Sequence, residues 1–355
     1  MQVSEARAGS FGIKASFFKL KKEAFMPNDP ALASDTCIFL EAITGDGGSH
    51  NNNDVWWLSP DIKLVGPASG IDKADPGVAN PVAVTVHRKP DADCTLTPGT
   101  ESIVIEVWVG NPSLAMTPDN PASTTLIQSI GSPLPNAGDK RVEAFDWTPP
   151  AGLPAADPQS PGHKCLIVRC YPDPLTPSAK NFFVPDEPHV AQHNICIVPC
   201  GGPQTERIHP RCGLNIQTVN VHADIAETVT FRAVFDRRPN PFVREVVLRR
   251  LSALPDFKRL SAVRPRRFNL ILPDFPDAQV SDQTQPGCLG GLFGGGRLPP
   301  TFEVRVELQP AQFTHLRFNA DISNATPGDA FIFHIRQVGS DGHDQGGLTA
   351  VMVAV

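Results

Sequence analysis

The sequence predicts an all-β protein made of two immunoglobulin-like antiparallel β-sandwich domains with long loops rich in proline and glycine. First, 37 of the 355 residues are proline, whose fixed φ angle and missing N–H group leave few windows for an uninterrupted helix. Second, apolar residues recur at every second position in many short segments, as they do in a half-buried strand. Third, turns rich in proline and glycine separate these segments. Only residues 242–254 come near a helical period.

The first half of the chain holds six expected strands. Val82, Val84 and Val86 show the clearest alternation there. By the same criterion we expect strands over residues 81–87, 102–109, 124–130, 141–147, 164–171 and 192–198. The segments between them, such as NPSLAMTPDNPAS and TPPAGLPAADPQSPGH, predict long surface loops.

The second half repeats the same pattern of strands and turns. Its clearest strand covers residues 301–308, where four apolar residues alternate with Glu303, Arg305 and Glu307. Further strands are expected over residues 227–235, 315–320, 330–338 and 348–355. About seven strands at this spacing predict an antiparallel sandwich.

Length and composition predict two domains, since a domain usually takes roughly 100–200 residues. The segment PCGGPQTERIHPRCG at 199–213 predicts the linker, and all four tryptophans precede it. The expected organisation is an N-terminal arm with possible strands at 1–54, a first sandwich at 55–202, and a second sandwich at 203–355 with a basic insertion at 237–267.

Residues 55–200 resemble the CARDB family, the cell-adhesion-related domains of bacteria. The motifs that carry this resemblance are WWLSPDIKL at 56–64, SIVIEVWVGNPS at 102–113, VEAFDWTPP at 142–150, GHKCLIVRCYPD at 162–173 and VAQHNICIV at 190–198. The resemblance implies an immunoglobulin-like sandwich with a role in adhesion, spacing or partner binding. It implies no catalytic residues. The second half resembles no single family beyond a generic immunoglobulin-like sandwich.

Four residues around the predicted linker have ligand types that suit zinc: Cys196, Cys200, His209 and Cys212. The surrounding glycines and prolines would allow a tight coordinating turn, although the spacing is not that of a standard finger. A disulfide between Cys200 and Cys212 and uncoordinated buried thiols are the alternatives. A structural zinc ion is the only cofactor that the sequence suggests.

A basic segment distinguishes the second half. Residues 237–267 contain ten basic side chains and only two acidic ones, although the whole chain has a formal net charge of −6. The candidate partner-binding residues are Arg237, Arg238, Arg244, Arg249, Arg250, Arg264, Arg266 and Arg267. Stacking aromatic residues are sparse here, which disfavours nucleic acid. Docking on an acidic protein, or head-to-tail contact between acidic first halves and basic second halves, uses the same charges.

The glycine-rich segment GCLGGLFGGGR at 287–297 lacks the Lys-Ser/Thr and the helix that a phosphate-binding loop needs. Its apolar residues Leu292 and Phe293 are further candidate partner-binding residues.

The sequence therefore predicts a non-enzymatic structural or adhesive protein, acting through its surfaces as a subunit of a larger assembly with a protein partner or with itself. The alternative is a metal- or ligand-binding accessory module of an enzyme complex. No local catalytic motif occurs. We expect no membrane span, and, because no apolar stretch of signal-peptide length occurs near the N-terminus, a cytoplasmic location or export without a classical leader.

Overall fold

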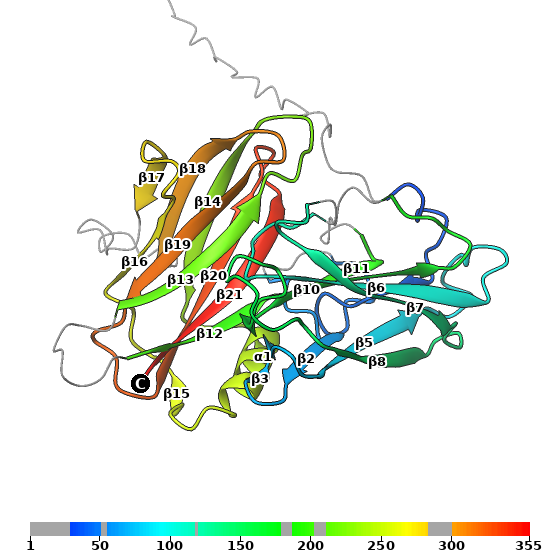
Figure 1. The fold of residues 1–355 in the computed structure, drawn as a ribbon, viewed down its shortest axis with the longest axis horizontal. Coiled ribbons are helices and arrows are strands. Elements are labelled where there is room, and N and C mark those ends of the chain that lie inside the picture. The colour runs from blue at the N-terminus through cyan, green and yellow to red at the C-terminus, as the bar shows by residue number, and fades with distance from the viewer. Residues whose placement is uncertain (1–28, 51–54, 118–119, 179–186, 202–210, 283–299) are drawn as a thin grey trace, which may run out of the picture.

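The computed structural model describes residues 29–50, 55–117, 120–178, 187–201, 211–282 and 300–355. These residues form two immunoglobulin-like β-sandwiches that lie side by side, the second on the left and the first on the right of Figure 1. The described chain contains one α-helix of 11 residues, and its other regular elements are strands. The all-β prediction is confirmed.

The first sandwich packs a sheet of five strands on a sheet of four. In the larger sheet the order is β1-β5-β2-β3, and β8 also pairs with β5; in the smaller it is β11-β10-β6-β7. The bounds are β1 Ile38–Phe39, β2 Ile62–Gly66, β3 Gly70–Ile71, β5 Asn80–Arg88, β6 Ser102–Gly110, β7 Thr125–Pro133, β8 Lys140–Trp147, β10 Cys165–Pro172 and β11 Val190–His193. A small separate sheet pairs β4 Lys73–Ala74 with β9 Gly162–His163.

The second sandwich packs a sheet of seven strands on a sheet of three. In the larger sheet the order is β12-β21-β20-β14-β18-β17, and β15 also pairs with β20; in the smaller it is β13-β19-β16. The bounds are β12 Ile195–Cys200, β13 Arg211–Val219, β14 Glu227–Asp236, α1 Pro241–Leu251, β15 Arg259–Leu260, β16 Arg267–Ile271, β17 Gln279–Asp282, β18 Thr301–Leu308, β19 Phe313–Asp321, β20 Asp329–Val338 and β21 Asp344–Ala354.

Strand alternation builds both sandwich cores. In β5 the side chains of Val82, Val84 and Val86 are buried, as predicted, and they face the core of the first sandwich. In β20 the alternation is lost, because Phe331 and Phe333 enter the core of the second sandwich while Ala330 and Ile332 enter a separate cluster on the opposite face. Strands that are buried on both faces have continuous runs of apolar residues. The periodicity of the sequence alone therefore does not distinguish such a strand from a buried helix.

The predicted domain boundary after residue 202 is wrong. The chain passes from β11 in the first sandwich to β12 in the second with only Asn194 between them. Strands β12 and β13, which flank the predicted linker, both belong to the second sandwich. The sheets are also not purely antiparallel, since β12 runs parallel to β21 and β15 runs parallel to β20.

The two sandwiches meet in an extensive apolar interface. Trp57 is fully buried there, and its Nε1 donates to Thr349 Oγ1 in β21 at 2.9 Å. Asn194, between β11 and β12, donates from Nδ2 to the carbonyl of Gly347 at 2.7 Å. A methyl group on Gly347 would overlap the Trp57 indole. The missing side chain at this glycine therefore lets the first sandwich approach β21.

We predict that Gly347→Ala destabilises the protein by about 1–3 kcal/mol, because the added methyl group overpacks a fully buried contact. Urea denaturation monitored by tryptophan fluorescence measures this free energy. Gly131→Ala is the matched control, since a methyl group there meets no atom within 4 Å. Equal stability of the two variants would contradict the proposed close contact.

The described part of the predicted N-terminal arm belongs to the first sandwich. Strand β1 pairs with β5, and Cys37 beside β1 forms a disulfide with Cys94. Asp35 and Glu187 flank the buried imidazole of His189, with Oδ2 of Asp35 3.0 Å from Nε2 and Oε1 of Glu187 2.5 Å from Nδ1. Residues 29–50 are therefore integrated into the domain, which corrects the separate arm at 1–54.

Because Asp35 and Glu187 contact the His189 imidazole, we expect the unfolding free energy of the protein to depend on pH. Burial alone would lower the pKa of His189, but its hydrogen bonds with Asp35 and Glu187 outweigh burial and raise the pKa to about 9. A raised folded-state pKa contributes stability that is full below the unfolded value near 6.5 and disappears as pH rises through 9.

We therefore expect the unfolding free energy of the wild type, relative to His189→Gln, to fall by roughly 3 kcal/mol between pH 6 and pH 10. Urea denaturation at each pH measures the difference. His315→Gln is the control because His315 is exposed on β19. A wild-type advantage over His189→Gln that stays constant across this range would disprove the assignment.

Candidate interaction site

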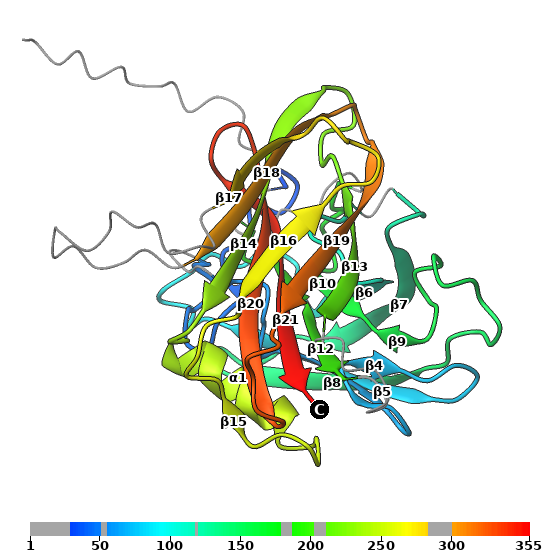
Figure 2. The ribbon, with the colours of Figure 1, turned by 90° about the vertical axis from the view of Figure 1, so that its left-hand side faces the viewer.

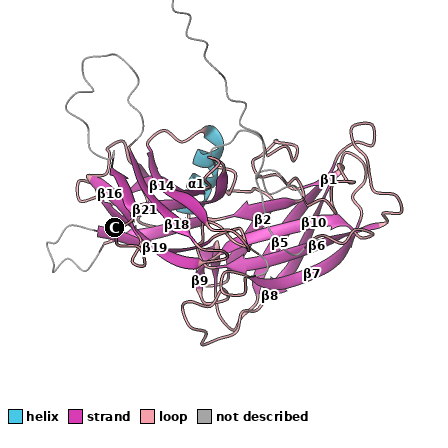
Figure 3. Ribbon diagram, turned by 90° about the horizontal axis from the view of Figure 1, so that it is seen from above, coloured by secondary structure: helices cyan, strands magenta, loops and turns pink. Residues whose placement is uncertain are grey.

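The helix α1 lies near the start of the basic segment 237–267, and its own sequence determines where it begins. Asn240 caps it by accepting a hydrogen bond from the Val243 N–H at 2.9 Å, and Pro241 occupies the first turn. Its apolar face of Val243, Val246, Val247 and Leu251 packs on the outer face of β20 and β21, next to residues of the first sandwich. Figure 3 shows the helix lying against these sheets. The remaining face points its charged residues toward solvent.

Arg250 is not part of a partner-binding surface, which corrects the sequence prediction for this residue. It is buried, and its guanidinium forms an ion pair with Asp72 of the first sandwich. Nη2 also lies 2.8 Å from Nε2 of His193, and Nη1 donates to the Val246 carbonyl at 3.1 Å. The arginine therefore joins α1 to the first sandwich, because a buried guanidinium needs a nearby carboxylate.

The ion pair also controls the charge of Asp72. Burial would raise the pKa of this carboxyl, but His193 and Arg250 outweigh burial and lower the pKa to about 2. Asp72 thus stays ionised over the whole physiological range. The stability that it contributes is complete above the unfolded-state pKa near 3.8 and is lost as pH falls from there through about 2.

The exposed arginines of the segment form a separate feature. Arg249 pairs with Glu245 one helical turn away at 2.6 Å, and Arg264 is half-buried. Five other arginines of the segment are exposed and form no ion pair with another residue of the described ranges. We call these five residues the basic surface: Arg237, Arg238, Arg244, Arg266 and Arg267.

The topology gathers the basic surface at one end of the second sandwich. Strand β14 ends just before Arg237, and its last residue Asp236 is in register with Ile332 near the start of β20. Strand β16 starts at Arg267, in register with Asp321 at the end of β19. In Figure 2 this end lies at the bottom, where α1 and β15 are.

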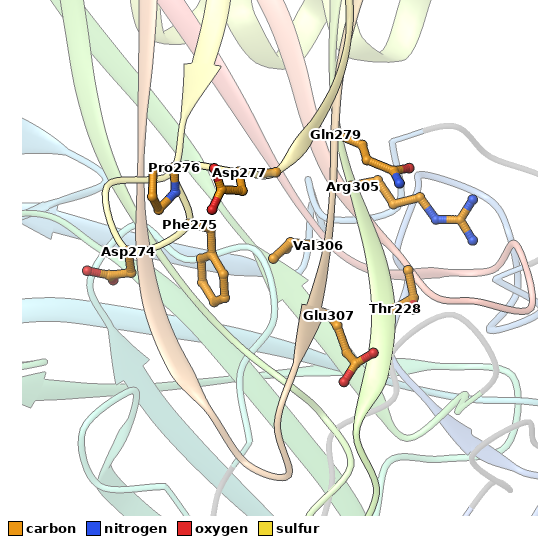
Figure 4. A pocket seen from close by; sticks show the side chains of 10 residues that line it. Thr228, Asp274, Phe275, Pro276, Asp277, Gln279, Arg305, Val306 and Glu307 are labelled. Atoms are coloured by element: carbon orange, nitrogen blue, oxygen red, sulfur yellow. The ribbon is translucent and has the colours of Figure 1, made fainter.

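A groove of about 650 Å³ lies at the opposite end of the same sandwich. The loop after β16 forms one wall with Asp274, Phe275 and Asp277, and strands β14 and β18 form the other (Figure 4). Three of its charged lining residues are acidic, Asp274, Asp277 and Glu307, and one is basic, Arg305. We call this the acidic groove.

A smaller cleft of about 130 Å³ lies between β2, β3 and α1. Val65 and Ile71 line it and are 41% and 36% exposed. His193 and Arg250 also line this cleft, so the ion pair that joins the sandwiches borders it.

The predicted zinc site is replaced by a disulfide, the alternative that the sequence left open. Cys200 and Cys212 are bonded to each other, so neither sulfur is a thiolate that could bind zinc. Cys196 is buried in the core of the second sandwich, and burial raises the pKa of its thiol to about 12. His209 and the candidate partner-binding residues Leu292 and Phe293 lie outside the described residues.

No family model and no curated protein matches this chain. Three solved structures have some similarity to this chain, and two of them are adhesins. The collagen adhesin of S. aureus is 8% identical, covers 83% of this chain and 93% of its own, and has a TM-score of 0.22. The C-terminal domain of the Streptococcus pyogenes antigen I/II-family protein AspA is 6% identical over 84% and 100% of the two chains, also at 0.22.

The third structure is a mutant of the CFA/I enterotoxigenic E. coli adhesin CfaE, 8% identical over 93% of this chain and 89% of that one, with a TM-score of 0.22. TM-scores of this size do not establish a common fold, so the sandwich assignment rests on the sheets described above. Among the described residues, no helix has the length and apolar character needed to cross a membrane.

We predict that Arg250→Ala destabilises the protein by about 3–5 kcal/mol, because it leaves Asp72 charged and buried without its partner. Arg244→Ala, on the exposed face of the same helix, should change stability by less than about 0.5 kcal/mol. Thermal and urea denaturation compare the two variants. A loss in Arg250→Ala no larger than in Arg244→Ala would show that the buried pair does not hold the sandwiches together.

Proposed function

We propose that this protein is a non-catalytic structural or adhesive subunit that assembles with further copies of itself through its surfaces. The observation that carries this proposal is the basic surface, since five exposed arginines on one end of a folded domain have no acidic partner among the described residues. Exposed like charges repel one another and gain free energy when an acidic surface docks on them.

The charge distribution supports a second copy as the partner. The acidic groove lies at the end of the second sandwich away from the basic surface. A contact between the basic surface of one copy and the acidic groove of the next is heterologous, and such contacts produce rings or filaments.

The two disulfides support a location in an oxidising environment, where such bonds form and persist. A structural or adhesive subunit at a cell surface would meet this condition.

The test uses two variants that each damage one surface. We expect Arg266→Glu with Arg267→Glu to abolish the self-association of the wild type, because the variant reverses the charge of two of the five arginines in the basic surface. Asp277→Lys with Glu307→Lys should do the same by removing the acidic groove. Analytical ultracentrifugation at low and high salt measures assembly, which should weaken with salt because exposed charges are screened.

A mixture of the two variants decides between this contact and a general charge effect. Each variant retains one intact surface, so the mixture should form dimers and stop there. Lys140→Glu with Arg317→Glu is the control, since both residues are exposed outside the two surfaces and the charge change equals that of the arginine variant. A monomeric wild type at all concentrations, or assembly lost equally in the control, would reject the proposal.

A further inference from the structure

Three potential metal ligands converge at one edge of the first sandwich. One ligand atom each from Glu41, Asp61 and His87 lies within 4.8 Å of the other two. Glu41 follows β1, Asp61 precedes β2, and His87 is near the end of β5. Because β1 and β2 both pair with β5, the sheet itself brings residues distant in sequence to one place.

The surrounding structure fixes the three side chains. Oδ2 of Asp61 accepts the backbone N–H of Glu41 at 2.6 Å, and its Oδ1 lies 3.0 Å from Nε2 of His87. The His87 ring stacks on Phe39 with 5.0 Å between ring centres. Asp61 is buried, whereas Glu41 and His87 are half-buried. A solvated ion can therefore reach the cluster without opening the core.

The cluster holds more negative charge than its neighbours balance. Two carboxylates face one imidazole, Asp46 adds a third carboxylate nearby, and Lys140 is the additional cation that acts on His87. A divalent cation would neutralise this charge.

We propose that Glu41, Asp61 and His87 bind a divalent transition metal ion, and that zinc matches the donors best. Zinc accepts imidazole nitrogen together with carboxylate oxygen, whereas calcium and magnesium take oxygen donors. Three protein ligands leave a fourth position for water. The ion would join the ends of β1, β2 and β5. The Cys37–Cys94 disulfide lies beside β1 and does not include β2.

Isothermal titration of the full chain with zinc chloride tests the site. We expect one zinc ion per chain, and at least about tenfold weaker binding for His87→Ala and for Glu41→Gln. His222→Ala is the control, because His222 also lies beside a carboxylate, 3.4 Å from Glu227, but far from the cluster in the sequence and in the other sandwich. Glu41→Gln keeps the shape of the side chain, so it remains informative if His87→Ala does not fold.

Zinc should also raise the melting temperature of the wild type and not that of Glu41→Gln. Failure of the wild type to bind zinc, unchanged binding in both site variants, or binding of calcium in preference to zinc would each overturn the proposal. These outcomes do not depend on the basic surface or on self-association.

Discussion

The close approach of the first sandwich to β21 is the constraint on which the rest of the molecule depends. Trp57 lies against Gly347, and Asn194 bonds to the backbone of the same glycine. Together with α1, this contact covers the outer face of β20 and β21, which would otherwise expose a row of aliphatic side chains. The second sandwich thus requires the first as a cover, and the two sandwiches form a single packed unit.

Charge plays two opposite roles within the segment 237–267. Arg250 is taken out of water and matched to Asp72, so it serves the fold. The five arginines of the basic surface remain in water and form no ion pair among the described residues. Burial rather than residue type separates the two roles, since Arg244 and Arg250 lie on different faces of α1, one exposed and the other buried.

The sequence correctly predicted strands that have one face exposed to solvent. Residues 301–308 alternate between apolar and charged side chains, and the strand has the same bounds in the structure. The sequence also predicted the strand over residues 330–338, which β20 confirms although both of its faces are buried. It was misread where a turn signal was taken for a domain boundary. Proline and glycine show that the chain reverses, but pairing across the whole chain decides which sheet each strand joins, as β12 and β21 illustrate.

For the candidate sites too, the sequence predicted some features, and others follow only from the fold. The excess of arginine was visible in the sequence, yet the burial of Arg250 depends on Asp72, which lies 178 residues away. The Cys200–Cys212 bond could be suggested from spacing but not separated from a zinc site. Glu41, Asp61 and His87 have no common motif, and only the pairing of β1 and β2 with β5 brings them together.

The unbroken passage from β11 to β12 has a mechanical consequence. A tether that pulls on the C-terminus would load β21 along its length, and β21 is held on one side by β12 and on the other by β20. Hydrogen bonds in such a pair must break together in shear and cannot open one after another. Tension would therefore spread into both sandwiches at once, with no flexible joint between them to extend first.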